Sequence, residues 1–168
     1  MIYIIDFDGV LFDVSKFKNA CQKQGIDFSD KIYEKSKTNN IYNPIKHLKL
    51  LGKSKKDLIK ILKQSKKFLF SGITKKLKKL SKHNKLILLS KGSLWFQKQK
   101  IKYSGLEKFF NKIYITEISK LEVFQEKIMP KYGQEKMIFI DDKKQELDAI
   151  KKIYPQIKSS QSLFFVIN

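Results

Sequence analysis

Two pairs of acidic residues each end a short apolar run in this sequence. Asp6 and Asp8 end a run that begins at Ile2, and Asp141 and Asp142 end a second run. Short apolar runs predict buried strands of a parallel sheet, and ligands bind outside the carboxyl ends of such strands. If the two strands are neighbours, their carboxylates repel one another unless a cation lies between them. Because oxygen ligands favour Mg²⁺ over Zn²⁺, this edge predicts a magnesium site.

A second chemical feature is the segment Ser90-Lys91-Gly92-Ser93, which follows the apolar run Leu86–Leu89. A strand that enters a Ser-X-Gly turn and then a helix can hold a phosphate, since the hydroxyl and the turn amides donate hydrogen bonds. Ser and Gly are also ordinary turn residues, and Asp at a strand end can simply cap a helix. The chemical interpretation therefore depends on all three segments lying at one edge.

The elements that would position these residues alternate along the chain. Apolar runs predict five strands, and between most of them apolar residues recur at helical spacing. The predicted strands are 2–5, 86–89, 113–115, 137–140 and 163–167. The helix that contains Leu121 and Phe124 is expected to end at Pro130 and Gly133. This order predicts an α/β fold with a doubly wound parallel sheet of about five strands.

One long segment interrupts the alternation. Residues 15–70 contain no convincing strand, and they are far more numerous than a crossover between parallel strands requires. Ser54, followed by Asp57 three residues later, is a candidate helix N-cap within this segment. We therefore expect an α/β core of residues 1–14 and 71–168, with residues 15–70 inserted as a small α-helical cap above the strand ends.

Composition narrows the class of protein. The net charge is +20, and all 36 basic residues are lysines. Arginine is the side chain best suited to reading bases, so its absence argues against specific nucleic-acid recognition. We rank three explanations for the lysine excess. Compositional bias comes first, binding of a small anionic substrate second, and binding of nucleic acid third. Cys21 is the only cysteine, and no apolar run is long enough to span a membrane, so we expect a cytoplasmic protein with no membrane partner.

These motifs resemble those of the haloacid dehalogenase (HAD)-like hydrolase superfamily. The segment Asp6-Phe7-Asp8-Gly9-Val10 is similar to the first motif, Asp-X-Asp-Gly followed by Thr or Val. Ser90 resembles the second motif, a strand that ends in Ser or Thr, and Asp141-Asp142 resembles the acidic fourth motif. The likeness covers nearly the whole chain except residues 15–70, where it implies a cap by position only.

The resemblance implies a phosphatase that works through an aspartyl-phosphate intermediate. Asp6 would be the nucleophile and Asp8 the general acid and base, whereas dehalogenases lack an acid two residues after the nucleophile. Mg²⁺ would be bound by Asp6, by the backbone carbonyl of Asp8 and by Asp142, with Asp141 nearby. The phosphate would be held by Ser90, Lys91, Gly92 and the third-motif lysine. Lys120 is our choice for that lysine, and Lys127 is the alternative.

Two other functions stay open at this level. A phosphotransferase or sugar-phosphate mutase would share the same core and differ in how its cap excludes water. A non-catalytic nucleic-acid-binding module would use the basic helices of residues 44–85. We expect the substrate to be a small phosphorylated metabolite. Its identity and the oligomeric state of the protein cannot be read from the sequence.

Overall fold

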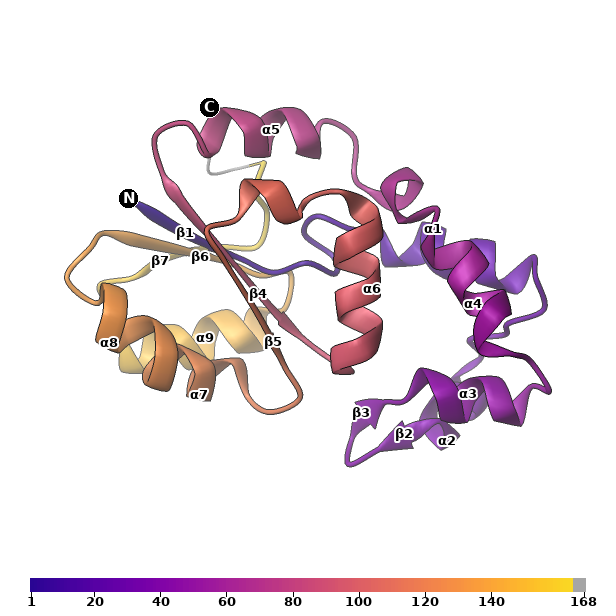
Figure 1. Cartoon of the computed structure of the whole chain (residues 1–168). Helices are drawn as coiled ribbons and strands as arrows, with labels where there is room; N and C mark the ends of the chain where they lie inside the picture. The colour runs from indigo at the N-terminus through magenta and orange to yellow at the C-terminus, as the bar shows by residue number, and fades with distance from the viewer. Residues whose placement is uncertain (165–168) are drawn as a thin grey trace.

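The central element is a parallel sheet with helices on both faces, in a computed structural model that describes residues 1–164 (Figure 1). Its five strands lie in the order β5-β4-β1-β6-β7. They are β1 (Ile2–Ile5), β4 (Lys85–Lys91), β5 (Lys112–Thr116), β6 (Met137–Ile140) and β7 (Lys158–Ser160). Every ladder between them is parallel. The predicted doubly wound α/β fold is therefore confirmed.

The two faces of the sheet are covered by different helices. On β1, Tyr3 and Ile5 belong to one apolar cluster, while Ile2 and Ile4 belong to the other, as the two-residue repeat of a strand requires. The first cluster includes residues of α5 (Ile73–Leu80) and α6 (Leu94–Ser104). The second includes residues of α7 (Lys120–Val123), the π-helical turn Phe124–Ile128 and α9 (Lys144–Ile153). Burying each such aliphatic side chain contributes about 1.5–3 kcal/mol, so both faces stabilise the fold.

The register of the sheet brings the two acidic pairs together. Ile5 on the central strand β1 pairs with Leu88 on one side and with Ile140 on the other. The amide of Asp6 then donates a hydrogen bond to the carbonyl of Ile140 at 2.9 Å. Asp6 and Asp141 therefore lie side by side at the carboxyl end of the sheet.

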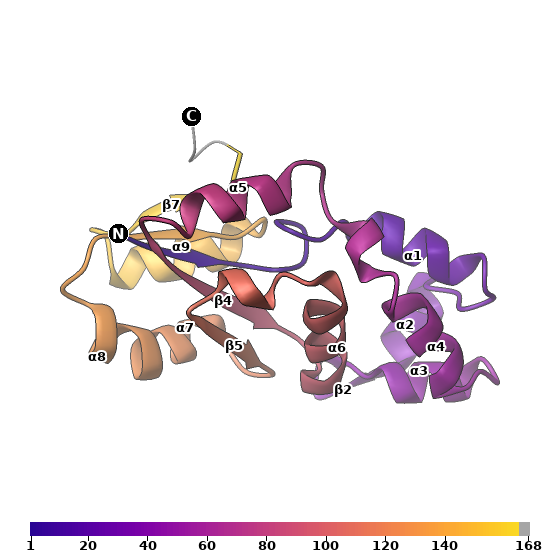
Figure 2. The ribbon, with the colours of Figure 1, turned by 45° about the horizontal axis from the view of Figure 1, so that its top comes forward.

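The long segment after β1 lies beside the sheet and beyond α6 (Figures 1 and 2). It contains α1 (Val14–Gln22), α2 (Asp30–Lys35), β2 (Lys37–Thr38), β3 (Ile41–Tyr42), α3 (Pro44–Leu50), α4 (Lys55–Leu62) and a 3-10 turn (Ser65–Phe68). The expected N-cap is present, because the Ser54 side chain accepts from the amide of Asp57 and the Asp57 side chain accepts from the amide of Ser54. The segment also holds an antiparallel β2–β3 pair, which the helical prediction missed.

Two predicted elements differ from the structure near the C-terminus. The predicted strand 163–167 is wrong where it can be compared: β7 lies at Lys158–Ser160, Leu163 and Phe164 lie in a turn, and residues 165–167 fall outside the described part of the chain. An edge strand needs fewer apolar side chains, and Leu163 is buried as a loop residue packed on the core. Pro130 also does not end its helix, because it lies in the first turn of α8 (Met129–Tyr132), where a missing N–H costs little.

Within residues 1–164, no helix has both the length and the apolar character needed to cross a bilayer.

Candidate active site

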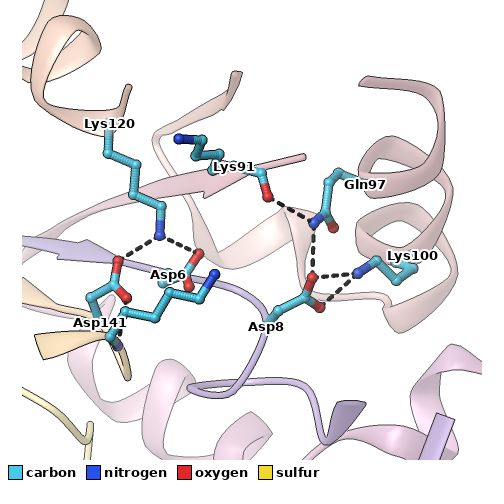
Figure 3. A network of polar contacts seen from close by, with 8 residues as sticks. Asp6, Asp8, Lys91, Gln97, Lys100, Lys120 and Asp141 are labelled. Atoms are coloured by element: carbon cyan, nitrogen blue, oxygen red, sulfur yellow. Dashed lines mark hydrogen bonds and ion pairs between the residues drawn. The ribbon is translucent and has the colours of Figure 1, made fainter. Parts of the chain in front are cut away.

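A buried lysine lies between two buried carboxylates at the carboxyl edge of the sheet (Figure 3). Lys120 Nζ is 2.9 Å from Asp6 Oδ1 and 2.5 Å from Asp141 Oδ2. The Ser119 side chain caps α7 by accepting from the amide of Leu121. Lys120 is the first residue of this capped helix. Lys127, the alternative third-motif lysine, is an exposed residue of the π-helical turn. The geometry therefore favours Lys120.

Burial dominates the electrostatics of this cluster. It raises the pKa of Asp6 from 3.8 to about 7, even though Lys120 acts to lower that pKa, and the carboxylates of Asp141 and Asp8 add to the rise. Burial also acts to lower the pKa of Lys120, but Asp6 and Asp141 outweigh it, and the pKa is raised. The positive charge of Lys120 is thus stabilised, whereas the negative charge of Asp6 costs free energy unless a further cation lies nearby.

Three carboxylates are grouped closely enough to bind one metal ion. Asp6, Asp141 and Asp142 each offer an oxygen, and these oxygens all lie within 4.8 Å of one another. Both oxygens of Asp141 already accept hydrogen bonds, from Lys120 and from the amide of Lys143. Burial raises the pKa of Asp142, and neighbouring Asp141 raises it further. An oxygen-only group of this kind fits Mg²⁺, with Asp6 and Asp142 as the better placed side-chain ligands.

Gly9 allows Asp142 to approach the loop after β1. Its φ is +79°, and a Cβ at this position would collide with the carboxylate of Asp142. Only glycine combines that backbone conformation with that clearance. The first motif and the acidic pair after β6 are therefore in direct contact through this residue.

The Ser90 segment lies at the same edge, although its strand is longer than predicted and includes both Ser90 and Lys91. Ser90 is 1% exposed, and its Oγ has no hydrogen-bond partner among the described residues. A buried hydroxyl in that state is costly unless a ligand completes it. The amide of Gly92, however, already donates to the carbonyl of Thr116 at 2.8 Å, so Gly92 serves the turn rather than a phosphate here.

Asp8 is held by two residues that the sequence did not indicate. Lys100 Nζ lies 2.7 Å from Asp8 Oδ1 and 2.5 Å from Asp8 Oδ2, and Gln97 Nε2 donates to Oδ2 at 2.8 Å (Figure 3). The carboxylate of Asp8 is therefore not part of the group formed by Asp6, Asp141 and Asp142. Lys100 is almost fully buried, and its Nζ lies over the ring of Phe96 at 4.8 Å. Nothing in the sequence separates Lys100 from the other lysines, because the contact spans 92 positions.

Comparison with known proteins gives a consistent fold. No family model and no curated protein sequence matches this chain. Among solved structures, a haloacid dehalogenase-like hydrolase from Burkholderia xenovorans is similar with a TM-score of 0.70 and 19% identity, over 94% of this chain and 80% of that one. L-2-haloacid dehalogenase from Xanthobacter autotrophicus, with chloropropionic acid covalently bound, has a TM-score of 0.60 and 13% identity, over 94% and 75%.

A third similar structure contains a metal. It is a HAD-type hydrolase from Bacillus subtilis bound to magnesium, with a TM-score of 0.55 and 15% identity, over 83% of this chain and 76% of that one. The fold of the chain is therefore that of the HAD-like hydrolases, as the motifs indicated. Because the group includes a dehalogenase, the fold alone does not select the reaction.

Proposed function

We propose that the chain is a Mg²⁺-dependent phosphohydrolase that transfers a phosphoryl group to Asp6 and then to water. The observation that carries the proposal is the convergence of Asp6, Lys120 and Asp142 at one edge of the sheet, with Asp6 and Lys120 buried. A carboxylate nucleophile needs no activating base, but it must approach an anionic substrate. A cation next to the nucleophile removes that repulsion.

Each residue has a distinct part in the proposed reaction. Asp6 Oδ attacks phosphorus, and Lys120 neutralises charge on the phosphoryl oxygens. Asp8 gives a proton to the leaving oxygen, and later takes one from the water that hydrolyses the aspartyl-phosphate. Ser90 Oγ, buried and lacking a partner among the described residues, donates to a phosphate oxygen. Mg²⁺ held by Asp6 and Asp142 would supply further positive charge at the phosphate.

Asp8 supports phosphate chemistry over dehalogenation. A halide leaves without a proton, so a dehalogenase gains nothing from an acid at this position. An alkoxide leaving group does need one. Asp8 lines the cavity above the site, and both of its oxygens are oriented by residues of α6. These contacts hold the Asp8 carboxylate at the cavity, where the leaving oxygen of a substrate would lie.

The test is phosphate release from 4-nitrophenyl phosphate in the presence of Mg²⁺. We expect Asp6→Asn to abolish release, because the amide is not a nucleophile and cannot replace the carboxylate at the metal. Asp148→Asn is the matched control, since Asp148 is an exposed residue of α9. Activity that survives Asp6→Asn would remove Asp6 as the nucleophile. Phosphate retained on an isomeric product would instead assign a mutase.

A further inference from the structure

A single cavity joins the proposed reaction centre to the inserted segment. Its volume is about 520 Å³, which is within the range of small-molecule sites and far more than a phosphate requires. Asp8, Gly9 and Asp142 are among its lining residues, and so are Tyr33 and Tyr42 of the inserted segment. The cavity therefore has room for the leaving group of the substrate as well as for its phosphate.

Four aromatic residues of this lining, Phe28, Tyr33, Tyr42 and Phe96, form an aromatic wall. Tyr33 and Tyr42 are stacked, with ring centres 5.2 Å apart and an interplanar angle of 18°. Phe28 lies 5.8 Å from Tyr42, and Phe96 meets Tyr42 edge-on at 5.4 Å. The inserted segment and helix α6 thus build the wall together, with α6 contributing Phe96.

Three of the four rings of the wall are more exposed than the rings of the core against which they pack. The core rings of Phe12 and Phe17 are buried, at 0% and 2% exposure. Phe28, Tyr33 and Tyr42 are only partly buried, and all three line the cavity. These three partly exposed rings can gain contact area from a ligand, and Phe96, at 6% exposure, is the buried member of the wall behind them.

Two polar side chains at the wall, Tyr42 and Gln97, are already engaged in hydrogen bonds within the protein. The Nε2 of buried His47 donates to the carbonyl of Asp27 at 2.6 Å, so in the neutral ring Nδ1 accepts from the Tyr42 hydroxyl at 2.8 Å. Burial lowers the pKa of His47, which favours this neutral ring. Gln97 is likewise engaged with Asp8 and with the carbonyl of Lys91. A flat ring bound at this wall would meet the faces and edges of its aromatic rings.

The positive charge of Lys18 beside the wall restricts which kind of ring can bind. Lys18 Nζ lies 5.3 Å from the ring centre of Tyr33 and 5.7 Å from that of Phe28. Lys18 also lines the cavity. An ammonium at this place disfavours a cationic ring and favours a neutral ring with electron-rich edges.

We infer that the substrate is a phosphate monoester that carries a neutral aromatic ring, and that the wall of Phe28, Tyr33, Tyr42 and Phe96 binds this ring. Nucleoside 5′-monophosphates have this chemistry and serve as probes. The inference rests on the proposed function, because it assigns the leaving group of that same reaction.

The experiment compares kcat/KM for adenosine and uridine 5′-monophosphates with kcat/KM for ribose 5-phosphate, which is the same ester without the ring. Base–aromatic stacking of about 1–3 kcal/mol predicts a preference of about five- to 150-fold for the better nucleotide. Tyr33→Leu should reduce that preference severalfold and leave kcat/KM for ribose 5-phosphate close to that of the wild type. Tyr132→Leu, a partly buried tyrosine of α8 outside the cavity, is the matched control and should keep the preference.

The outcomes separate this inference from the proposed function. Asp6-dependent release from 4-nitrophenyl phosphate, with ribose 5-phosphate cleaved as well as or better than both nucleotides, would overturn the aromatic assignment alone. An equal nucleotide preference in the wild type and in Tyr33→Leu would do the same for the wall. Failure to release phosphate from any of these esters would count against the proposed function itself.

Discussion

Burial opposes the negative charge of Asp6, and replacing this residue should therefore stabilise the metal-free protein. Burial raises the pKa of Asp6 to about 7, despite the ion pair with Lys120. An asparagine at this position has nearly the same shape and never ionises. We expect Asp6→Asn to be more stable than the wild type near pH 8 and close to it near pH 4.

The size of the effect follows from the two pKa values. Because the folded value is raised above the unfolded value of 3.8, the folded state holds the proton more tightly than the unfolded chain. This stabilisation is complete below the unfolded value and is lost as the pH rises through the folded one. A difference of about three pKa units corresponds to about 4 kcal/mol. For a domain of this size that is a difference in Tm of about 8–16 °C near pH 8.

The assay is thermal or urea denaturation of both proteins in a chelating buffer, between pH 4 and pH 8. Mg²⁺ is then added near pH 8, where it should stabilise the wild type and have little effect on Asp6→Asn, since the variant lacks one of the ligands. Asp148→Asn is the control and should follow the wild type. Parallel stability curves for the wild type and Asp6→Asn across this pH range would show that the charge on Asp6 costs the folded state nothing.

Three further predictions concern the neighbours of Asp6. Lys120→Met should lower kcat for phosphate release by about 10²–10³-fold, because it removes a buried cation from the transition state; an effect below tenfold would contradict this. Lys100→Met should lower kcat/KM for alkyl phosphates by about 10²-fold and less for 4-nitrophenyl phosphate, because Asp8 loses its partner and good leaving groups need no acid; exposed Lys98 supplies the control, Lys98→Met. Gly9→Ala should weaken Mg²⁺ binding measured by calorimetry, since a Cβ displaces Asp142; unchanged affinity would contradict that account.

The parts of the fold that the sequence predicted are those with strong local patterns. The apolar runs of β1 and β6 end in acids, and the parallel register then places Asp6 beside Asp141 without further information. Lys120 could be chosen because it begins a helix directly after β5. In each case a short-range pattern fixed the element, and sheet topology fixed the contact.

The parts that were missed depend on contacts between distant segments or on weak patterns. Lys100 meets Asp8 only because α6 packs beside the loop after β1, and no periodicity marks that contact. The edge strand β7 is polar, while Leu163, three residues after it, is buried in a turn. The β2–β3 pair has only two residues in each strand, with Asn39 and Asn40 at positive φ between them. Such a short hairpin leaves too few alternating residues to be recognised.

In the proposed reaction, Asp6 receives the phosphoryl group. The most direct measurement is to quench the protein with acid during turnover of a phosphate monoester with Mg²⁺, and to locate the phosphoryl group by peptide mass spectrometry. We predict a phosphoryl group on Asp6 in the wild type and none in Asp6→Asn. A phosphoryl group on another residue, or none on Asp6 while hydrolysis proceeds and the second step is slow enough to trap it, would contradict the account.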